Sequence, residues 1–106
     1  MATGDKFYLG GQKAFQNYFS YNSSVGTTEV NVPLNFTTSC IKFISNDDEM
    51  NDLIVSFGTV ATTASTGLNG VITLKPGEVI NELNIAISRI NFKRTTGSGK
   101  VRFLGV

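Results

Sequence analysis

The sequence predicts an all-β fold: a single antiparallel β-sandwich, jelly-roll-like and of about seven strands, with an extended N-terminal arm. Three observations predict it. Short runs alternate apolar and polar side chains, as half-buried strands do. The breaks between these runs contain turn-forming residues. The runs recur roughly every ten residues, a spacing typical of two-sheet sandwiches, and the 106 residues fit one domain.

The chain divides into residues 1–26, interpreted as the arm, and residues 27–106, interpreted as the sandwich. Six of the eleven aromatic residues lie in the arm, among Gly, Gln, Asn and Ser. We expect little regular structure there, and we expect the aromatic side chains to lie on the surface of another subunit. These candidate partner-binding residues are Phe7, Tyr8, Phe15, Tyr18, Phe19 and Tyr21.

Seven segments after residue 27 carry the period-two pattern of strands. The clearest alternation is in the fifth, where Leu83, Ile85 and Ile87 face one way and the intervening residues face the other. The predicted strands are residues 28–32, 39–45, 52–57, 70–74, 82–88, 89–94 and 100–104.

Turn chemistry separates the predicted strands. Residues 75–78 place Pro76 second and Gly77 third, which is the preference of a type II turn. Residues 96–99, Thr-Gly-Ser-Gly, are predicted to form a hairpin loop between the last two strands. Residues 59–70 form a Thr/Ala/Ser/Gly-rich connection that is long for a hairpin.

The composition argues against an enzyme. The chain contains no histidine, which is the commonest general base near neutral pH and a leading metal ligand. Its Ser and Thr hydroxyls therefore have no imidazole to activate them. The single cysteine, Cys40, begins an apolar strand, where we expect a small core residue rather than a reactive thiol. We expect neither catalysis nor a cofactor.

An acidic loop at residues 46–52 is the best candidate for a cation site, because carboxylate and amide oxygens are ligands that Ca²⁺ favours. The spacing lacks the EF-hand pattern, however, and Asp and Asn also stabilise ordinary turns. We therefore expect no metal and interpret the loop as a solvated turn or an intersubunit contact. Its candidate contact residues are Asp47, Asp48, Glu49 and Asp52.

A basic stretch covers residues 89–102 and contains no acidic residue. Clustered cations could pair with nucleic-acid phosphates, but the net charge of +1 is small for such a binder or for a membrane-surface binder. The alternatives are the charged outer face of a sheet, or a surface that meets the acidic loop of a neighbouring copy. The candidate contact residues are Arg89, Lys93, Arg94, Lys100 and Arg102.

A resemblance to a known class of protein covers roughly residues 38–106. It is carried by Ile41–Asp47 (IKFISND), Asp52–Phe57 (DLIVSF), Leu74–Glu78 (LKPGE) and the last part of the chain, INFKRT followed by GKVRFLGV. These segments resemble small virion structural proteins of tailed bacteriophages. The resemblance implies a compact β-sandwich in which a Lys-Pro-Gly-Glu turn leads to a pair of strands.

The resemblance also implies a function. It predicts a capsid decoration or cement protein that binds the head shell through protein–protein contacts, made in the bacterial cytoplasm and located in the virion. Its expected partners are the major capsid protein or neck and tail subunits, with further copies of itself in an oligomer or lattice. A neck, collar, tail-adaptor or fibre-anchoring protein is the alternative. A nucleic-acid- or glycan-binding β module is a more distant one. No membrane partner is expected.

Overall fold

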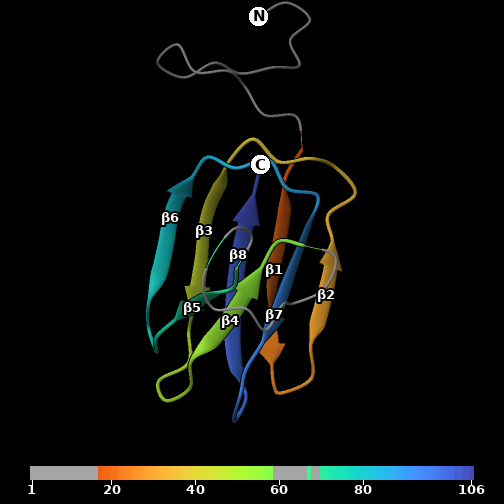
Figure 1. Cartoon of the computed structure of the whole chain (residues 1–106). Helices are drawn as coiled ribbons and strands as arrows, with labels where there is room; N and C mark the ends of the chain where they lie inside the picture. The colour runs from red at the N-terminus through yellow and green to blue at the C-terminus, as the bar shows by residue number, and fades with distance from the viewer. Residues whose placement is uncertain (1–16, 59–66, 68–69) are drawn as a thin grey trace, which may run out of the picture.

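The structure is a computed structural model of the chain, and it describes residues 17–58, 67 and 70–106. These residues form eight strands and contain no helix, so no helix among them could cross a membrane. The strands are β1 (Phe19–Val25), β2 (Val30–Pro33), β3 (Ile41–Asn46), β4 (Leu53–Ser56), β5 (Ile72–Leu74), β6 (Val79–Leu83), β7 (Arg89–Lys93) and β8 (Gly99–Gly105). The predicted all-β sandwich is confirmed, with eight strands instead of about seven (Figure 1).

The strands form two four-stranded sheets in which all neighbours are antiparallel. The first sheet has the order β1-β8-β3-β6 and the second has the order β2-β7-β4-β5. Every connection except that between β4 and β5 therefore crosses from one sheet to the other. This interleaved order of eight strands in two sheets is a jelly roll.

The two ends of the sandwich carry different connections (Figure 1). The β1–β2, β3–β4, β5–β6 and β7–β8 connections lie at the end drawn lowest, which we call the lower end. The β2–β3 and β6–β7 connections lie at the opposite, upper end. The start of β1 and the last residue of the chain are also at the upper end, because Phe19 pairs with Gly105.

The core lies between the sheets. In β8 burial alternates, with Val101 and Phe103 turned inward and Lys100 and Arg102 exposed, as the period-two rule requires. The ring of Phe103 meets the ring of Phe92 from the second sheet edge-on at 6.5 Å between centroids. The fully buried aliphatic side chains around these rings are Val25, Ile41, Ile44, Leu53, Val55, Ile90 and Val101.

The first strand is absent from the sequence prediction, which placed residues 19–25 in the arm. The expectation of little regular structure is wrong for these residues, because they pair with β8 along its whole length. Their exposed positions are Ser20, Asn22, Ser23 and Ser24, none of which is a typical β-branched or aromatic strand residue. Because this outward-facing row is polar, the apolar–polar pattern did not reveal the strand, whose other side faces the core.

The strand predicted at residues 82–88 is also misplaced. The observed strand, β6, is Val79–Leu83, and residues 84–88 form the crossing connection at the upper end. The apolar alternation there has another cause. The Thr38 hydroxyl donates to the carbonyl of Ile85 and accepts from the N–H of Ile87, so it holds the connection against the β2–β3 loop.

The predicted turns had different outcomes. At residues 75–78 the N–H of Glu78 donates to the carbonyl of Lys75, and Gly77 has a φ of 76°, as a type II turn requires. The predicted hairpin at residues 96–99 is wrong, because β7 and β8 belong to different sheets and do not pair. That connection instead crosses the lower end of the sandwich.

Candidate partner-binding surfaces

Among the aromatic residues predicted to bind a partner, the three that the structure describes do not form one exposed surface. The other three, Phe7, Tyr8 and Phe15, lie outside the described residues. Tyr18 is 73% exposed, just before β1. The ring of Phe19 lies 6.5 Å from the Phe103 ring, and the ring of Tyr21 stacks on Phe92 at 5.2 Å. Phe19 and Tyr21 therefore pack within their own sandwich, and Tyr18 is the aromatic that this part of the chain presents to solvent.

The basic residues are also divided. Arg89 and Lys93 are half-buried at the two ends of β7 in the second sheet, whereas Lys100 and Arg102 are exposed on β8 in the first sheet. Arg94 has no exposed surface at all. Arg94 is thus not available as a surface contact, in contrast to the prediction, and the five cations do not come together as one patch.

Arg94 instead ties together the lower end of the sandwich. Its Nε donates to the carbonyl of Val25 at 2.9 Å, and its Nη1 donates to Oδ1 of Asn46 at 3.0 Å. The remaining N–H groups reach the backbone carbonyls of Asn51, Asp52 and Lys100 at 3.0–3.4 Å. Burial lowers the pKa of this guanidinium, against the opposing effect of the Asp48 carboxylate. One side chain therefore joins the ends of β1, β3 and β8 to the β3–β4 loop.

Asn46, the last residue of β3, extends this network to the β5–β6 turn. Its Nδ2 donates to the carbonyls of Asn51, Leu74 and Lys75 at 3.0–3.1 Å. Its backbone carbonyl accepts the N–H of Gly77, and its N–H donates to the carbonyl of Glu78. We call Arg94 and Asn46 with these partners the lower-end network.

The carboxylates of the acidic loop make contacts within their own chain. Desolvation would raise the pKa of Asp48, but the N–H groups of Asn51 and Met50, which its carboxylate accepts, hold the pKa low. Asp52 forms an ion pair with Lys75 at 3.1 Å, and Glu49 is exposed. The described residues contain no group of three or more His, Cys, Asp or Glu side chains that could hold a metal ion. These contacts fit the alternative of a stabilised turn.

Asp47 pairs with Arg102 on the outer face of the first sheet. The Arg102 guanidinium donates to both carboxylate oxygens and also lies 5.6 Å above the ring of Phe43. The hydrogen bond from Arg102 lowers the pKa of Asp47, and the Ser45 hydroxyl adds to this effect while desolvation opposes it. The acidic loop and the basic stretch thus meet within one copy. The sequence analysis had offered a contact between neighbouring copies as one alternative.

Replacing Asp47 with asparagine should make the stability difference from the parent protein depend on pH. A carboxyl whose pKa is lowered by folding stabilises the folded state above its unfolded pKa of about 3.9, and this stability is lost as the pH falls through the folded pKa. We expect Asp47→Asn to cost up to about 1 kcal/mol near pH 7, because the pair is partly exposed. In urea unfolding the cost should be smaller near pH 2 than near pH 7. The exposed neighbour variant Glu49→Gln is the control, and an equal Asp47→Asn cost at both pH values would contradict this assignment.

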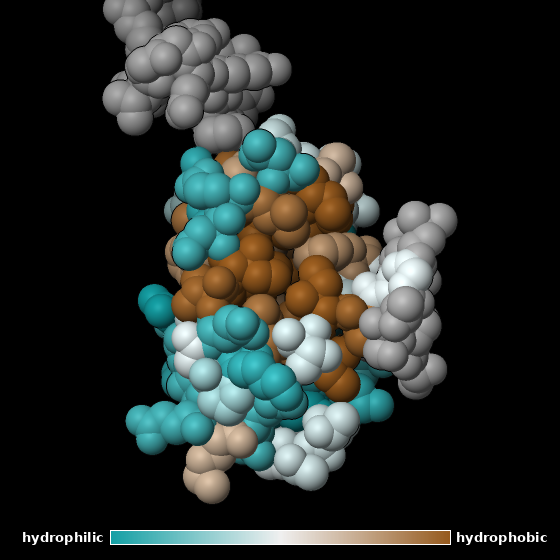
Figure 2. Space-filling model, turned by 60° about the vertical axis from the view of Figure 1, so that its left-hand side comes forward, coloured by the Kyte–Doolittle hydropathy of each residue, from teal (hydrophilic) through white to brown (hydrophobic). Residues whose placement is uncertain are grey.

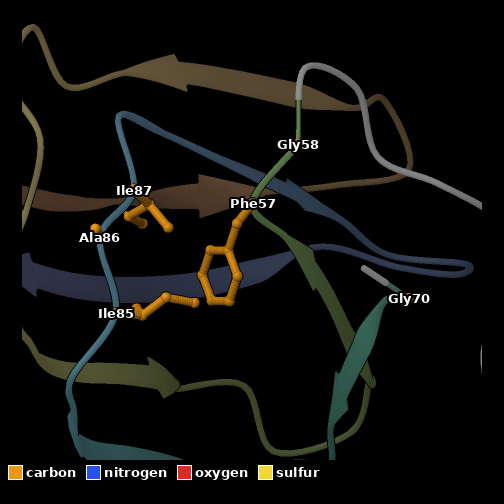
Figure 3. Close-up of a pocket in the computed structure, with 6 residues that line it drawn as sticks. All are labelled: Phe57, Gly58, Gly70, Ile85, Ala86 and Ile87. Atoms are coloured by element: carbon orange, nitrogen blue, oxygen red, sulfur yellow. The ribbon is translucent and has the colours of Figure 1, made fainter. Parts of the chain in front are cut away.

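An apolar cleft opens on the side of the sandwich where β5 and β6 are the edge strands (Figure 2). It has a volume of about 340 Å³ and is lined by Phe57, Gly58, Gly70, Ile85, Ala86 and Ile87. The Phe57 ring lies beside the Ile85 side chain, and Ile87 comes from the same β6–β7 connection (Figure 3). The half-buried residues Ile72 of β5 and Ile80 and Leu83 of β6 continue the apolar character along the two edge strands.

The cleft was not predicted from the sequence, because it combines three segments that are distant along the chain. The pattern that could have revealed it is the run of apolar residues at 83–87, which was assigned to a strand. Cys40, by contrast, is buried as expected, and burial together with the Glu82 carboxylate raises the pKa of its thiol. Comparisons of the chain with protein-family models, curated proteins and solved structures find no match.

Proposed function

We propose that this chain is a virion structural protein, a decoration or cement protein that binds the head shell of a tailed bacteriophage through protein–protein contacts. The observation that carries the proposal is the jelly-roll strand order, since jelly rolls recur in viral capsid proteins. The sequence resemblance over residues 38–106 points in the same direction.

The lower-end network supports a mechanical role. Four chain connections meet at that end, and Arg94 and Asn46 bind carbonyl groups from several of them. A fully satisfied buried polar network rigidifies its surroundings and specifies one arrangement of the loops. A sandwich whose loops are fixed in this way suits a protein that must keep its shape while neighbouring subunits bind its surface.

The charge distribution supports protein partners over nucleic acid. Phosphate binding draws on a summed positive field over one surface. Within the basic stretch, Arg94 is buried and Arg102 is paired with Asp47. Its other three cations are divided between the sheets, with Arg89 and Lys93 on β7 and Lys100 on β8. We therefore expect only weak DNA binding in a fluorescence assay, without a steep dependence on salt. Tight, salt-steep binding that required Lys93 and Lys100 would argue for the nucleic-acid alternative.

Quantitative mass spectrometry of purified phage particles tests the proposal. A decoration protein should be present in hundreds of copies per particle, whereas six, twelve or a few multiples would favour the neck or tail alternative. Absence of the chain from particles would overturn both. Electron microscopy of the same particles would show which surface it covers.

Deletion of residues 1–16 should reduce the number of copies per particle by about tenfold, the effect of losing about 1.4 kcal/mol of contact free energy. The deletion stops before Asn17 because a longer one would remove part of β1 and would test folding instead of binding. A matched variant, Ser98→Ala at the exposed lower end, should incorporate normally. Unchanged incorporation of the deletion variant would remove the arm from the proposed contact.

A further inference from the structure

The chain enters the sandwich on the side opposite the apolar cleft. The cleft lies on the β5 and β6 side, and β1, where the chain enters at its upper end, is the opposite edge of the first sheet. Tyr18, the exposed aromatic just before β1, is on this entry side. Two copies placed side by side in the same orientation would therefore bring the entry side of one copy next to the cleft of the other.

The residues before Asn17 have the composition that would fill such a cleft. Phe7, Tyr8 and Leu9 form the one run of three large apolar residues there, followed by Gly10 and Gly11. A buried aromatic side chain contributes about 150–250 Å² of contact area, and the lining of the cleft is mainly aliphatic and aromatic. An apolar hollow that is open to solvent is itself a common mark of a binding site.

The length of this segment allows it to reach the cleft of a neighbouring copy. The twelve residues from Phe7 to Phe19 span up to about 40 Å when extended. One four-stranded sheet is only about 14 Å wide, at roughly 4.8 Å between strands. The segment is therefore long enough to reach either its own cleft or the cleft of an adjacent copy, and the many copies held side by side in the proposed function favour the adjacent one.

We infer that the apolar cleft of each copy binds the Phe7–Leu9 segment of a second copy of this chain. The contact is heterologous, since the entry side of one copy meets the cleft side of the next, and such contacts propagate around a ring or across a lattice. The inference rests on the proposed function, in which a particle surface holds many copies side by side and adds avidity to each contact.

Disulfide trapping tests the inference on the purified full-length chain. The variant carries Gly10→Cys, directly after the Phe7–Leu9 segment, and Ala86→Cys, with Cys40→Ala to remove the native thiol. Ala86 lines the cleft and is exposed, so cysteine there should leave folding intact. After mild oxidation we expect covalent dimers and higher multimers on non-reducing gels. Their yield should exceed that of a Gly10→Cys, Ser98→Cys control, also with Cys40→Ala, by about tenfold, because docking raises the effective concentration of the two thiols.

Adding Ile85→Asp to the trapping variant should remove this excess, because it places a charge in the apolar lining. Disulfides formed within single chains would overturn the inference by showing that each arm occupies its own cleft. A dimer yield equal to that of the control would overturn it as well. Particle analysis is independent of this experiment, so a chain absent from particles but trapped as multimers would sink the proposed function alone.

Discussion

Replacement of Arg94 by methionine is expected to lower the free energy of unfolding by about 2–4 kcal/mol, a large part of the stability of a domain of this size. The guanidinium is fully buried and donates to Asn46 Oδ1 and to four backbone carbonyls. Methionine keeps much of the volume but donates nothing, so each of these acceptors would lose one hydrogen bond at a buried or partly buried site.

Urea unfolding near pH 7 measures this effect, with Arg89→Met as the matched control. Arg89 is half-buried at the end of β7 in the second sheet, so the control should change stability by about 0.5 kcal/mol or less. Arg94→Lys should recover only part of the loss, because one ammonium group cannot reach acceptors on several sides. A loss below about 1 kcal/mol in Arg94→Met would show that the lower-end network does not stabilise the fold.

A double-mutant cycle between Arg94 and Asn46 would measure the energetic coupling of these two side chains within the lower-end network. Each single variant, Arg94→Met and Asn46→Ala, removes the bond between Nη1 and Oδ1 and also other bonds. We expect the double variant to cost less than the sum of the two by about 0.5–3 kcal/mol, the range found for residues in one hydrogen-bond network. Strict additivity would mean that the two side chains act independently.

The position of Arg94 could have been predicted from the pattern that predicted its strand. Ile90 and Phe92 were assigned to the inner face, and the next residue of the same parity is Arg94. Its charge suggested the surface, because arginine is seldom fully buried. The acceptors that make burial possible come from segments distant in the sequence, and no local sequence pattern indicates them.

The strand assignments show a related limit. Alternation correctly indicated β2, β3, β4, β5, β7 and β8 to within two residues at each end. It failed at β1, whose outer row consists of Ser and Asn, and at residues 84–88, where apolar side chains pack against another loop. Period-two alternation reports which side chains are buried, and a crossing connection can bury every second residue as a strand does.

The strand order illustrates what pattern cannot supply. Regular spacing predicted a sandwich, but pairings such as β3 with β6 and β2 with β7 join segments that are distant along the chain. The choice between a hairpin and a crossing at residues 94–98 depends on these long-range pairings. Turn chemistry is local, so it predicted a turn at that place without indicating which sheet the chain enters next.

Replacement of Tyr21 by alanine is expected to cost about 2–4 kcal/mol, whereas Tyr18→Ala should change stability by about 0.5 kcal/mol or less. The Tyr21 ring stacks on Phe92, a fully buried side chain, and its loss would leave a cavity between the two sheets. Tyr18 is largely exposed. The two variants remove the same side chain three residues apart, so urea unfolding of both locates the boundary between arm and sandwich. Equal and small costs would mean that residues 19–25 belong to an arm. The predicted inequality would mean that they form the first strand of the sandwich.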